Sequence, residues 1–369
     1  MTVVRRLASP VARPVARALV RARTAGWSEH SRLFAVGDAG GWSVDEDALH
    51  VAEAARRLGY ATGPAGWARF AAHQAVFLTS HFEALDRRWL STTHRLGTAY
   101  LHGRPGTLGA PEFDRAFEAL RREPERIERI QVTHEEMHEL VLAAGVPAER
   151  VFRIPIGIDI EHFPLGDGGA RLLARRALGV PESAFVVGSF QKDGVGWGEG
   201  LEPKLVKGPD VLVRALGRLH EEAPGLHVLL TGVARGYVRR ELERLGIPFT
   251  HARPETRSDL ARAYHALDVY LVASRQEGGP KAVLEAMATG VPLVTTRVGQ
   301  AQELVRDRAN GWVVDVDDAD ALAARALAML GGVDGAVLAA GRATAEAHAY
   351  VELDPLWASL LEGFVSRVG

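Results

Sequence analysis

Two glutamates of this chain lie eight positions apart, Glu277 and Glu285, on either side of a turn that is predicted to start a helix. The turn consists of Gly278, Gly279 and Pro280. Amide groups at a helix N-terminus point outward and favour an anionic or hydroxyl-rich ligand. A carboxylate beside a phosphate would be repelled, so both glutamates suit sugar hydroxyls better. Because Glu285 lies about one and a half turns further along the helix, it is expected to reach a second part of the same ligand.

These glutamates belong to a predicted strand–loop–helix–strand unit. Residues 268–274 (DVYLVAS) have the character of a buried strand, and residues 291–295 resume it. Between them, residues 281–289 are predicted to form a helix that has Pro280 as its first residue and ends at Gly290. Parallel sheets bind ligands at the carboxyl ends of such strands. The pattern therefore predicts a ligand site in the loop before the helix.

This segment carries a resemblance to a known family. Residues 268–314 resemble the retaining GT-B glycosyltransferases, especially glycosyltransferase family four (glycosyl transferases group 1). The family's Glu-x7-Glu motif is matched by Glu277 and Glu285, and residues 286–292 (AMATGVP) continue its pattern. In that family the first glutamate contacts the donor sugar and the second the ribose of the nucleotide.

The resemblance also implies two cations for the donor diphosphate, an Arg and a Lys in a Gly-Arg-x(n)-Lys-Gly pattern. Lys207, followed by Gly-Pro-Asp, matches the Lys half, but the Arg half is missing and a glycine-rich loop, 194–200, stretches the spacing. Lys192 is the candidate for the absent arginine and Lys204 the second choice. Protein cations can neutralise a departing diphosphate, so no metal and no cofactor are expected. The resemblance thus gives these donor-binding residues: Gly41, Lys192, Lys207, Glu277, Gly278, Gly279, Pro280 and Glu285.

The predicted catalytic residues are His102, Glu277 and Lys207. The family places a histidine of its first domain beside the donor sugar, and His102, at the end of the predicted strand 98–102, fits best. His81 and His134 also follow strands and are the weaker choices. No side chain is an obvious nucleophile, and the family's prevailing picture is a front-face reaction, so the protein is expected to position groups and stabilise charge.

Other polar features are interpreted without a catalytic role. The triplets Asp45-Glu-Asp47 and Asp315-Val-Asp317 spell a metal-binding Asp-x-Asp, but a chain with 46 acidic residues produces them by chance. Arg235 is expected to be a solvated loop arginine.

The alternation of strands and helices predicts an α/β fold of two Rossmann-like domains that face a cleft, the GT-B architecture. The predicted parts are a basic N-terminal arm (1–30), an acceptor-side Rossmann-like domain (31–160), a nucleotide-sugar-binding Rossmann-like domain (171–345) and a C-terminal segment (346–369) whose helix, by the resemblance, crosses back to the first domain.

Charge is unevenly distributed along the chain. The net charge is −2, yet residues 1–28 hold six arginines and no acid, which leaves −8 for residues 29–369. Arg13, Arg17 and Arg21 recur every four positions and would form one basic stripe on a helix. Contact of this arm with an anionic membrane and docking of the arm on the protein itself both stay open. The composition gives no nucleic-acid signature, and a cytoplasmic or membrane-peripheral location is expected.

The sequence therefore predicts a metal-independent enzyme that moves a sugar from a nucleotide sugar to an unidentified hydroxyl acceptor, with retention at the anomeric carbon. Two alternatives stay open at this point. One is a nucleotide-sugar epimerase of the same fold, and the other is a non-catalytic homologue that only binds nucleotide sugar.

Overall fold

The computed structural model describes residues 12–38 and 43–367. By its internal contacts the chain divides into two units. Unit 1 comprises residues 1–105, 112–154 and 350–369, and unit 2 comprises residues 106–111 and 155–349.

Unit 1 is built on a five-stranded parallel sheet with the order β1-β2-β3-β4-β5. Its strands are β1 (Leu33–Val36), β2 (Ala75–Leu78), β3 (Arg95–Ala99), β4 (Ile127–Val132) and β5 (Val151–Arg153). Strand β2 is buried along its whole length, as expected for a parallel strand covered by helices on both faces. The α-helices of this unit are α2 (Ala12–Thr24), α3 (Ser43–Arg57), α4 (His81–Ala84), α5 (Arg87–Leu90), α6 (Pro111–Arg122), α7 (Glu135–Ala143) and α16 (Asp354–Leu361), and its 3₁₀ turns are η1 (Ala65–Trp67), η2 (Pro124–Arg126), η3 (Ala148–Arg150) and η7 (Tyr350–Leu353).

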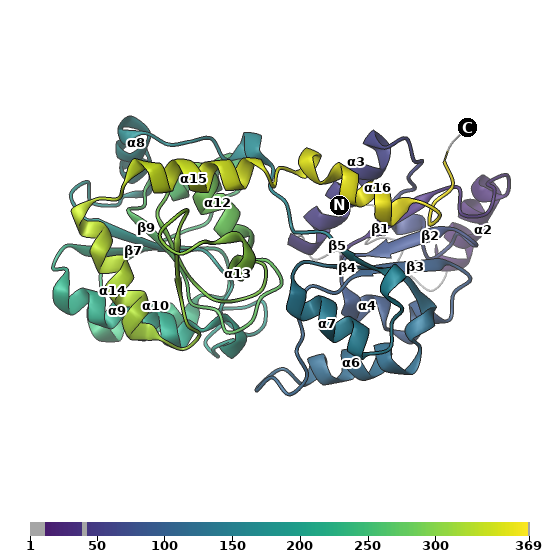
Figure 1. Cartoon of the computed structure of the whole chain (residues 1–369), viewed down its shortest axis with the longest axis horizontal. Coiled ribbons are helices and arrows are strands. Elements are labelled where there is room, and N and C mark those ends of the chain that lie inside the picture. The colour runs from purple at the N-terminus through teal and green to yellow at the C-terminus, as the bar shows by residue number, and fades with distance from the viewer. Residues whose placement is uncertain (1–11, 39–42, 368–369) are drawn as a thin grey trace. The chain divides into compact units, whose positions relative to one another are not determined.

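The last helix of the chain, α16, packs against α3 within unit 1 (Figure 1). Its Trp357 meets Phe77 of β2 edge to face, with ring centroids 5.7 Å apart. At its start Asp354 receives two hydrogen bonds from Arg57, at 2.7 and 2.8 Å. Beyond its end Phe364 is fully buried in the same core. The C-terminal segment is therefore an integral part of the unit 1 core.

Unit 2 contains a six-stranded parallel sheet with the order β11-β10-β9-β6-β7-β8. Its strands are β6 (Phe185–Ser189), β7 (Leu226–Thr231), β8 (Phe249–Ala252), β9 (Val269–Val272), β10 (Leu293–Thr296) and β11 (Trp312–Val314). From β6 the chain runs outward to β7 and β8, and it then returns to lay β9 on the other side of β6. The strand order reverses between β6 and β9, which makes this pair the topological switch point of the sheet.

Helices cover both faces of this sheet (Figure 1). Successive strand residues point to opposite faces, so Val187 and Leu271 belong to one core and their neighbours Val186 and Tyr270 to the other. The helical elements of unit 2 are η4 (Ile160–His162), α8 (Gly168–Leu178), η5 (Leu205–Lys207), α9 (Pro209–Glu222), α10 (Gly236–Leu245), α11 (Arg257–His265), α12 (Lys281–Thr289), α13 (Ala301–Leu304), α14 (Ala319–Leu327), η6 (Ala328–Gly331) and α15 (Gly335–Glu346).

The α/β fold class is confirmed, and three details differ from the sequence prediction. Pro280 is the N-cap of α12 and not its first helical residue, because its ψ of 107° is extended. Strand β3 ends at Ala99, so His102 lies three residues beyond the strand. Arg235 is buried and not solvated, and it pairs with the buried Asp193.

Within the described ranges, no single helix is long and apolar enough to span a membrane. The segments 319–331 and 335–346 meet the length and composition criteria only as a pair bent by 117°. Both segments contribute residues to the cores of unit 2, among them Leu322 and Ala345.

Candidate functional site

The residues predicted to bind a diphosphate and a sugar meet at the switch point of unit 2. Lys207 lies in the connection from β6 to α9, and Glu277 lies in the loop that follows β9. Gly208 has a positive φ of 60°, and a Cβ atom on it would overlap the carbonyl oxygen of Ala273. The carbonyl of Val206 also accepts hydrogen bonds from two successive amides of the β9 loop, at 2.9 and 3.1 Å. This close approach of two backbones, which only glycine allows, brings Lys207 next to Glu277.

The side chains of Lys207 and Glu277 form an ion pair. Lys207 Nζ donates to both carboxylate oxygens of Glu277, each at 2.6 Å. Ser274 Oγ donates a further hydrogen bond to Glu277 Oε1, at 2.8 Å. The Glu277 side chain is only 9% exposed and that of Lys207 is 25% exposed. A cation and an acceptor carboxylate are thus held together at the carboxyl ends of adjacent strands.

A second ion pair fixes these two loops to each other. Arg275, two residues before Glu277, binds Asp210 with two parallel hydrogen bonds of 2.7 Å. Burial raises the pKa of the Asp210 carboxyl, but the hydrogen bond and charge of Arg275 outweigh it and leave that pKa below its usual value. Arg275 Nε also donates to Asp317, at 2.6 Å. Asp210 belongs to the lysine motif, whereas Arg275 matches no motif and its place two residues before Glu277 was the available signal.

Glu285 lies in α12, where its side chain is buried. Tyr264 donates its hydroxyl hydrogen to Glu285 Oε2 at 2.8 Å, and Arg257 Nη1 lies 3.3 Å from Oε1. Burial raises the pKa of the Glu285 carboxyl, and the charge of Arg257 counteracts only part of this effect. The carboxylate is therefore oriented in advance by two neighbours that the sequence analysis did not identify.

Gln300 forms hydrogen bonds that hold the glycine turn between the two glutamates in place. The amide of Gln300 donates to the carbonyl of Gly278 at 2.9 Å. Its side-chain amide forms two hydrogen bonds with the backbone of Ile156, at 2.7 and 3.0 Å. A Cβ atom on Gly279 would lie 2.8 Å from Gln300 Oε1, so a larger residue here would have to displace the Gln300 side chain. Gln300 is a further residue that sequence patterns did not reveal.

Lys192 lies near Lys207, since the side chain of the preceding residue, Gln191, donates to the carbonyl of Lys207 at 2.8 Å. Its ammonium group sits over the ring of Trp197, 3.8 Å from the centroid. Partial burial lowers the pKa of Lys192, and the positive charge of Lys207 lowers it further. Two ammonium groups therefore share this corner of unit 2, as a diphosphate site needs.

The structure corrects the interpretation of Arg235 as a solvated loop residue. Its side chain and that of Asp193 are both 0% exposed and form an ion pair of 3.0 Å. Arg235 Nη1 donates to the carbonyls of Ser189 and Thr231 and Nη2 to the Ser189 hydroxyl, contacts that help the arginine to tolerate burial. The following loop residue, Gly236, starts helix α10.

His102 belongs to unit 1, where it lies among aromatic rings. Its ring centroid is 5.8 Å from that of His81, 6.0 Å from Phe82 and 5.5 Å from Phe113. Burial, assisted by the charge of His102, lowers the pKa of His81 well below its usual value, so His81 is neutral. His134 is also buried and contacts Thr133 Oγ1 at 2.9 Å. His102 therefore stays the preferred histidine as a prediction.

Two other predictions concern Gly41 and the acidic triplets. Gly41 lies outside the described residues. Asp317 pairs with Arg275, and Asp315 lies 3.5 Å from Arg297. Asp45 lies in the first turn of α3, where an acid suits the helix dipole.

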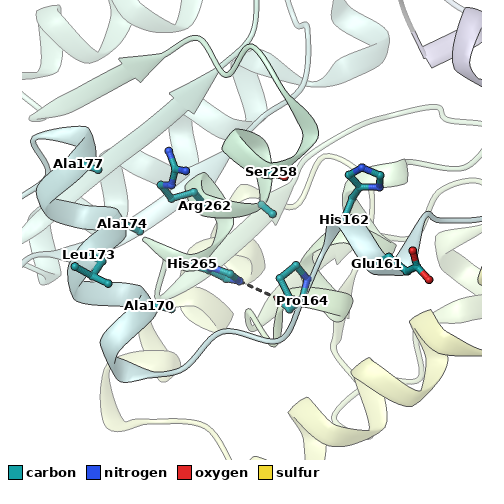
Figure 2. A pocket seen from close by; sticks show the side chains of 11 residues that line it. Glu161, His162, Pro164, Ala170, Leu173, Ala174, Ala177, Ser258, Arg262 and His265 are labelled. Atoms are coloured by element: carbon teal, nitrogen blue, oxygen red, sulfur yellow. Dashed lines mark hydrogen bonds between the residues drawn. The ribbon is translucent and has the colours of Figure 1, made fainter.

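A cavity of about 750 Å³ lies elsewhere in unit 2, between α8 and α11 (Figure 2). Leu173 and Ala177 line it from α8, and Arg262 and His265 line it from α11. His265 Nε2 is hydrogen-bonded to the carbonyl of Pro164 at 2.9 Å. None of the residues predicted to bind a donor lines this cavity, so its size does not make it the candidate site.

Comparison with known proteins places this geometry in a family context. Residues 198–331 match the model of the family described as glycosyl transferases group 1. A D-inositol 3-phosphate glycosyltransferase of Kribbella flavida is 36% identical over 209 residues, which are 52% of this chain and 46% of the relative. One from Corynebacterium urealyticum is 31% identical over 259 residues, 64% of this chain and 56% of the relative. The chain thus spans about half the length of the curated relatives it matches.

Solved structures extend the likeness to most of the chain. The Anabaena protein Alr3699/HepE, in complex with UDP and glucose, aligns with a TM-score of 0.71 at 17% identity and covers 90% of this chain and 100% of its own. The sucrose-phosphate synthase of Thermosynechococcus elongatus aligns with a TM-score of 0.64 at 19% identity, over 86% and 77% of the two chains. These likenesses show the fold, and the family match concerns residues 198–331. The chain therefore has the GT-B fold, and this part of its second unit is similar to the group 1 glycosyltransferases.

Proposed function

We propose that this protein is a glycosyltransferase that moves a sugar from a nucleotide-sugar donor to a hydroxyl acceptor, without a metal and with retention of anomeric configuration. The observation that carries the proposal is the pairing of Lys207 and Glu277 at the switch point between β6 and β9. Open α/β sheets bind ligands outside the carboxyl ends of their strands at this point.

Each group has an assigned task in this proposal. The ammonium groups of Lys207 and Lys192 neutralise the donor diphosphate as the sugar leaves, which is the charge stabilisation that a metal would otherwise supply. Glu277 accepts hydrogen bonds from sugar hydroxyls, and Glu285 accepts them from the ribose. The Lys207–Glu277 ion pair gives way to these contacts when the donor binds. His102 of unit 1 is the histidine that we propose for a role toward the donor sugar.

The comparisons support a nucleotide-sugar donor and give no support for an epimerase. The matched relatives carry the name glycosyltransferase, and HepE was solved with UDP and with UDP-glucose. Uridine diphosphate sugars are therefore the first donors to test. The non-catalytic alternative predicts that the protein binds a nucleotide sugar but never consumes it with any acceptor.

Thermal-shift assays with UDP, GDP, dTDP, ADP and CMP and their sugar conjugates test the donor site. A ligand at about 100 times its dissociation constant should add about 2.7 kcal/mol of stability. Turnover of the preferred donor with a panel of hydroxyl acceptors tests catalysis, and the NMR coupling constant of the product's anomeric proton tests retention. Turnover that survives a chelator supports metal independence. A protein that no nucleotide stabilises would contradict the donor assignment.

We further propose that helix α2 contacts anionic membrane lipids. Val15 and Leu19 are 59% and 60% exposed on one side of this helix, whereas Val20 is buried on the other. Arg17 and Arg21 are exposed as well, and residues 1–28 hold no acid. At about 3.6 residues per turn, Arg17 and Arg21 lie nearly opposite Val15 and Leu19, whereas the exposed Arg23 follows Leu19 by four residues on the same side. An exposed apolar strip that ends in an arginine, on a helix without acids, suits a surface of acyl chains and anionic headgroups. The cytoplasmic location stays a prediction.

Sedimentation with vesicles of phosphatidylglycerol in phosphatidylcholine tests this surface. The variant Val15→Asp/Leu19→Asp should lose vesicle binding, since two carboxylates would enter the lipid interface. Leu173→Asp, at an equally exposed leucine of α8, is the matched control and should bind normally. Equal binding by all three proteins would refute the contact.

A further inference from the structure

The loop that replaces the missing arginine motif is attached to a buried ion pair. Arg235 Nε donates to Asp193 Oδ1 at 3.0 Å, and neither side chain is exposed. Arg235 Nη1 also donates to the carbonyls of Ser189, at 2.6 Å, and Thr231, at 3.0 Å. These two residues end the adjacent strands β6 and β7. One guanidinium group therefore joins two strand ends to the residue that directly follows Lys192.

The loop itself is folded onto the segment that carries Arg235. Residues 193–204 close on themselves, because the amide of Val195 donates to Glu202 O and the amide of Lys204 to Asp193 O, both at 2.8 Å. The amides of Gly236 and Tyr237 donate to the carbonyls of Glu199 and Gly200, at 2.7 and 2.9 Å.

Glycine is required where the two segments touch. A Cβ atom on Gly194 or on Gly200 would overlap the carbonyl oxygen of Ala234. Gly200 also has a positive φ of 71°. Backbone packing against Ala234 therefore explains the glycines at the two ends of the 194–200 loop.

This arrangement matters because Lys192 and Lys207 repel each other. A lysine side chain has several rotatable bonds and would otherwise turn away from a second ammonium group. The backbone at Lys192 is held on both sides, since Asp193 is anchored by Arg235 and Gln191 donates to the carbonyl of Lys207. The Lys192 ammonium group lies over the ring of Trp197, a residue of the same loop. Two like charges that are fixed close together form a prepared site for a diphosphate.

We infer that Arg235 and Asp193 are positioning residues, which hold Lys192 and its loop beside Lys207 so that Lys192 serves as the second diphosphate cation. This inference rests on the proposed function, since it assigns the pair to the diphosphate subsite of the same donor. The family's arginine is thereby replaced by a lysine together with a buried anchor.

Binding of UDP and UMP, measured by calorimetry on Lys192→Met, Arg235→Met and the double variant, tests the inference. Both single variants should weaken UDP binding about tenfold, the effect of losing one charge-assisted hydrogen bond. UMP, which lacks the second phosphate, should be affected much less. The double variant should bind UDP no more weakly than Lys192→Met, because Arg235 acts through Lys192. Multiplicative losses in the double variant would overturn the inference.

A second buried arginine of unit 2 provides the matched control. Arg175 is 2% exposed, pairs with Asp268 at 2.7 Å and donates to three backbone carbonyls, all away from the loop. Arg175→Met should lower the melting temperature much as Arg235→Met does but leave UDP affinity unchanged. Equal UDP losses in both would mean that Arg235 has only a structural role, which refutes the inference.

Two further measurements keep the test decisive. If Arg235→Met does not fold, Asp193→Asn takes its place, because it weakens the anchor and keeps the side-chain volume. Wild-type protein that binds none of the nucleoside diphosphates would refute the proposed function itself. If the wild-type protein binds one of them and the variants at Arg235 and Asp193 keep the same affinity as Arg175→Met, only the positioning role is refuted.

Discussion

Replacing Lys207 by methionine separates the structural role of the Lys207–Glu277 pair from its role toward a ligand. The substitution leaves the Glu277 carboxylate 9% exposed, with Ser274 as its remaining hydrogen-bond donor among the contacts described. Removing one partner of a buried ion pair costs about 3–5 kcal/mol. Because a quarter of the Lys207 side chain is exposed to solvent, a loss of about 1–3 kcal/mol is the better expectation here.

A double-mutant cycle with Glu277→Gln measures this coupling. Glu277→Gln removes the negative charge and keeps an acceptor for the Ser274 hydroxyl, so the double variant should regain most of the stability lost in Lys207→Met. The coupling energy, obtained from denaturant unfolding of the four proteins, should be about 1–3 kcal/mol. The exposed pair of Arg218 and Asp320 is the control cycle, for which a coupling of at most about 1 kcal/mol is expected.

Ligand affinity should not follow the same pattern. Lys207→Met removes a charge-assisted hydrogen bond to the diphosphate, worth about 1.5–3 kcal/mol, or about 10- to 150-fold in the dissociation constant for UDP. The double variant should recover stability but not this affinity. If UDP affinity returned together with stability, Lys207 would act only through the fold, and its assignment as a diphosphate ligand would be refuted.

Three further outcomes follow from the structure. Gly208→Ala should reduce stability and UDP affinity together, since the added methyl group meets Ala273 O at a φ of 60°; melting and calorimetry check both, and an unchanged protein would contradict the close approach. Glu285→Gln should be more stable than wild type at pH 8, because the buried carboxyl has a raised pKa and its ionisation opposes folding as the pH rises above its unfolded value. This difference should vanish below about pH 4, where both forms are neutral, and each unit of pKa difference is worth about 1.4 kcal/mol; a stability gap that is the same at pH 4 and pH 8 would contradict it. Trp357→Ala should destabilise unit 1 by about 3–5 kcal/mol in denaturant unfolding, since the ring is buried against Phe77, whereas a loss below 1 kcal/mol would argue against this packing.

The sequence predicted the fold class and the strand–loop–helix–strand unit around the glutamates because those features are local. Apolar strands bounded by glycine and proline keep their period whatever they pack against. The helix over residues 281–289 and its end at Gly290, where φ is 75°, agree with the prediction for this reason.

Contacts between residues that are distant in sequence could not be predicted from these local patterns. Arg235 looked like a loop arginine, because nothing within the neighbouring residues shows that Asp193 is buried 42 positions earlier. Gln300 and Arg275 act through backbone groups and carboxylates on other loops, which have no periodic signature. The roles of Lys192, Lys207, Glu277, Glu285 and His102 toward a ligand stay predictions.

The interrupted course of unit 1 along the chain has a consequence for biosynthesis. Its core includes Trp357, Leu360 and Phe364, which a ribosome adds only after the whole of unit 2. Unit 2, by contrast, receives its last residue at Ala349. Domains generally fold in order from the N-terminus as they emerge. Here unit 2 can complete its fold before unit 1. Until residues 353–365 have been made, the sheet of unit 1 keeps an apolar face exposed, which must be protected from aggregation.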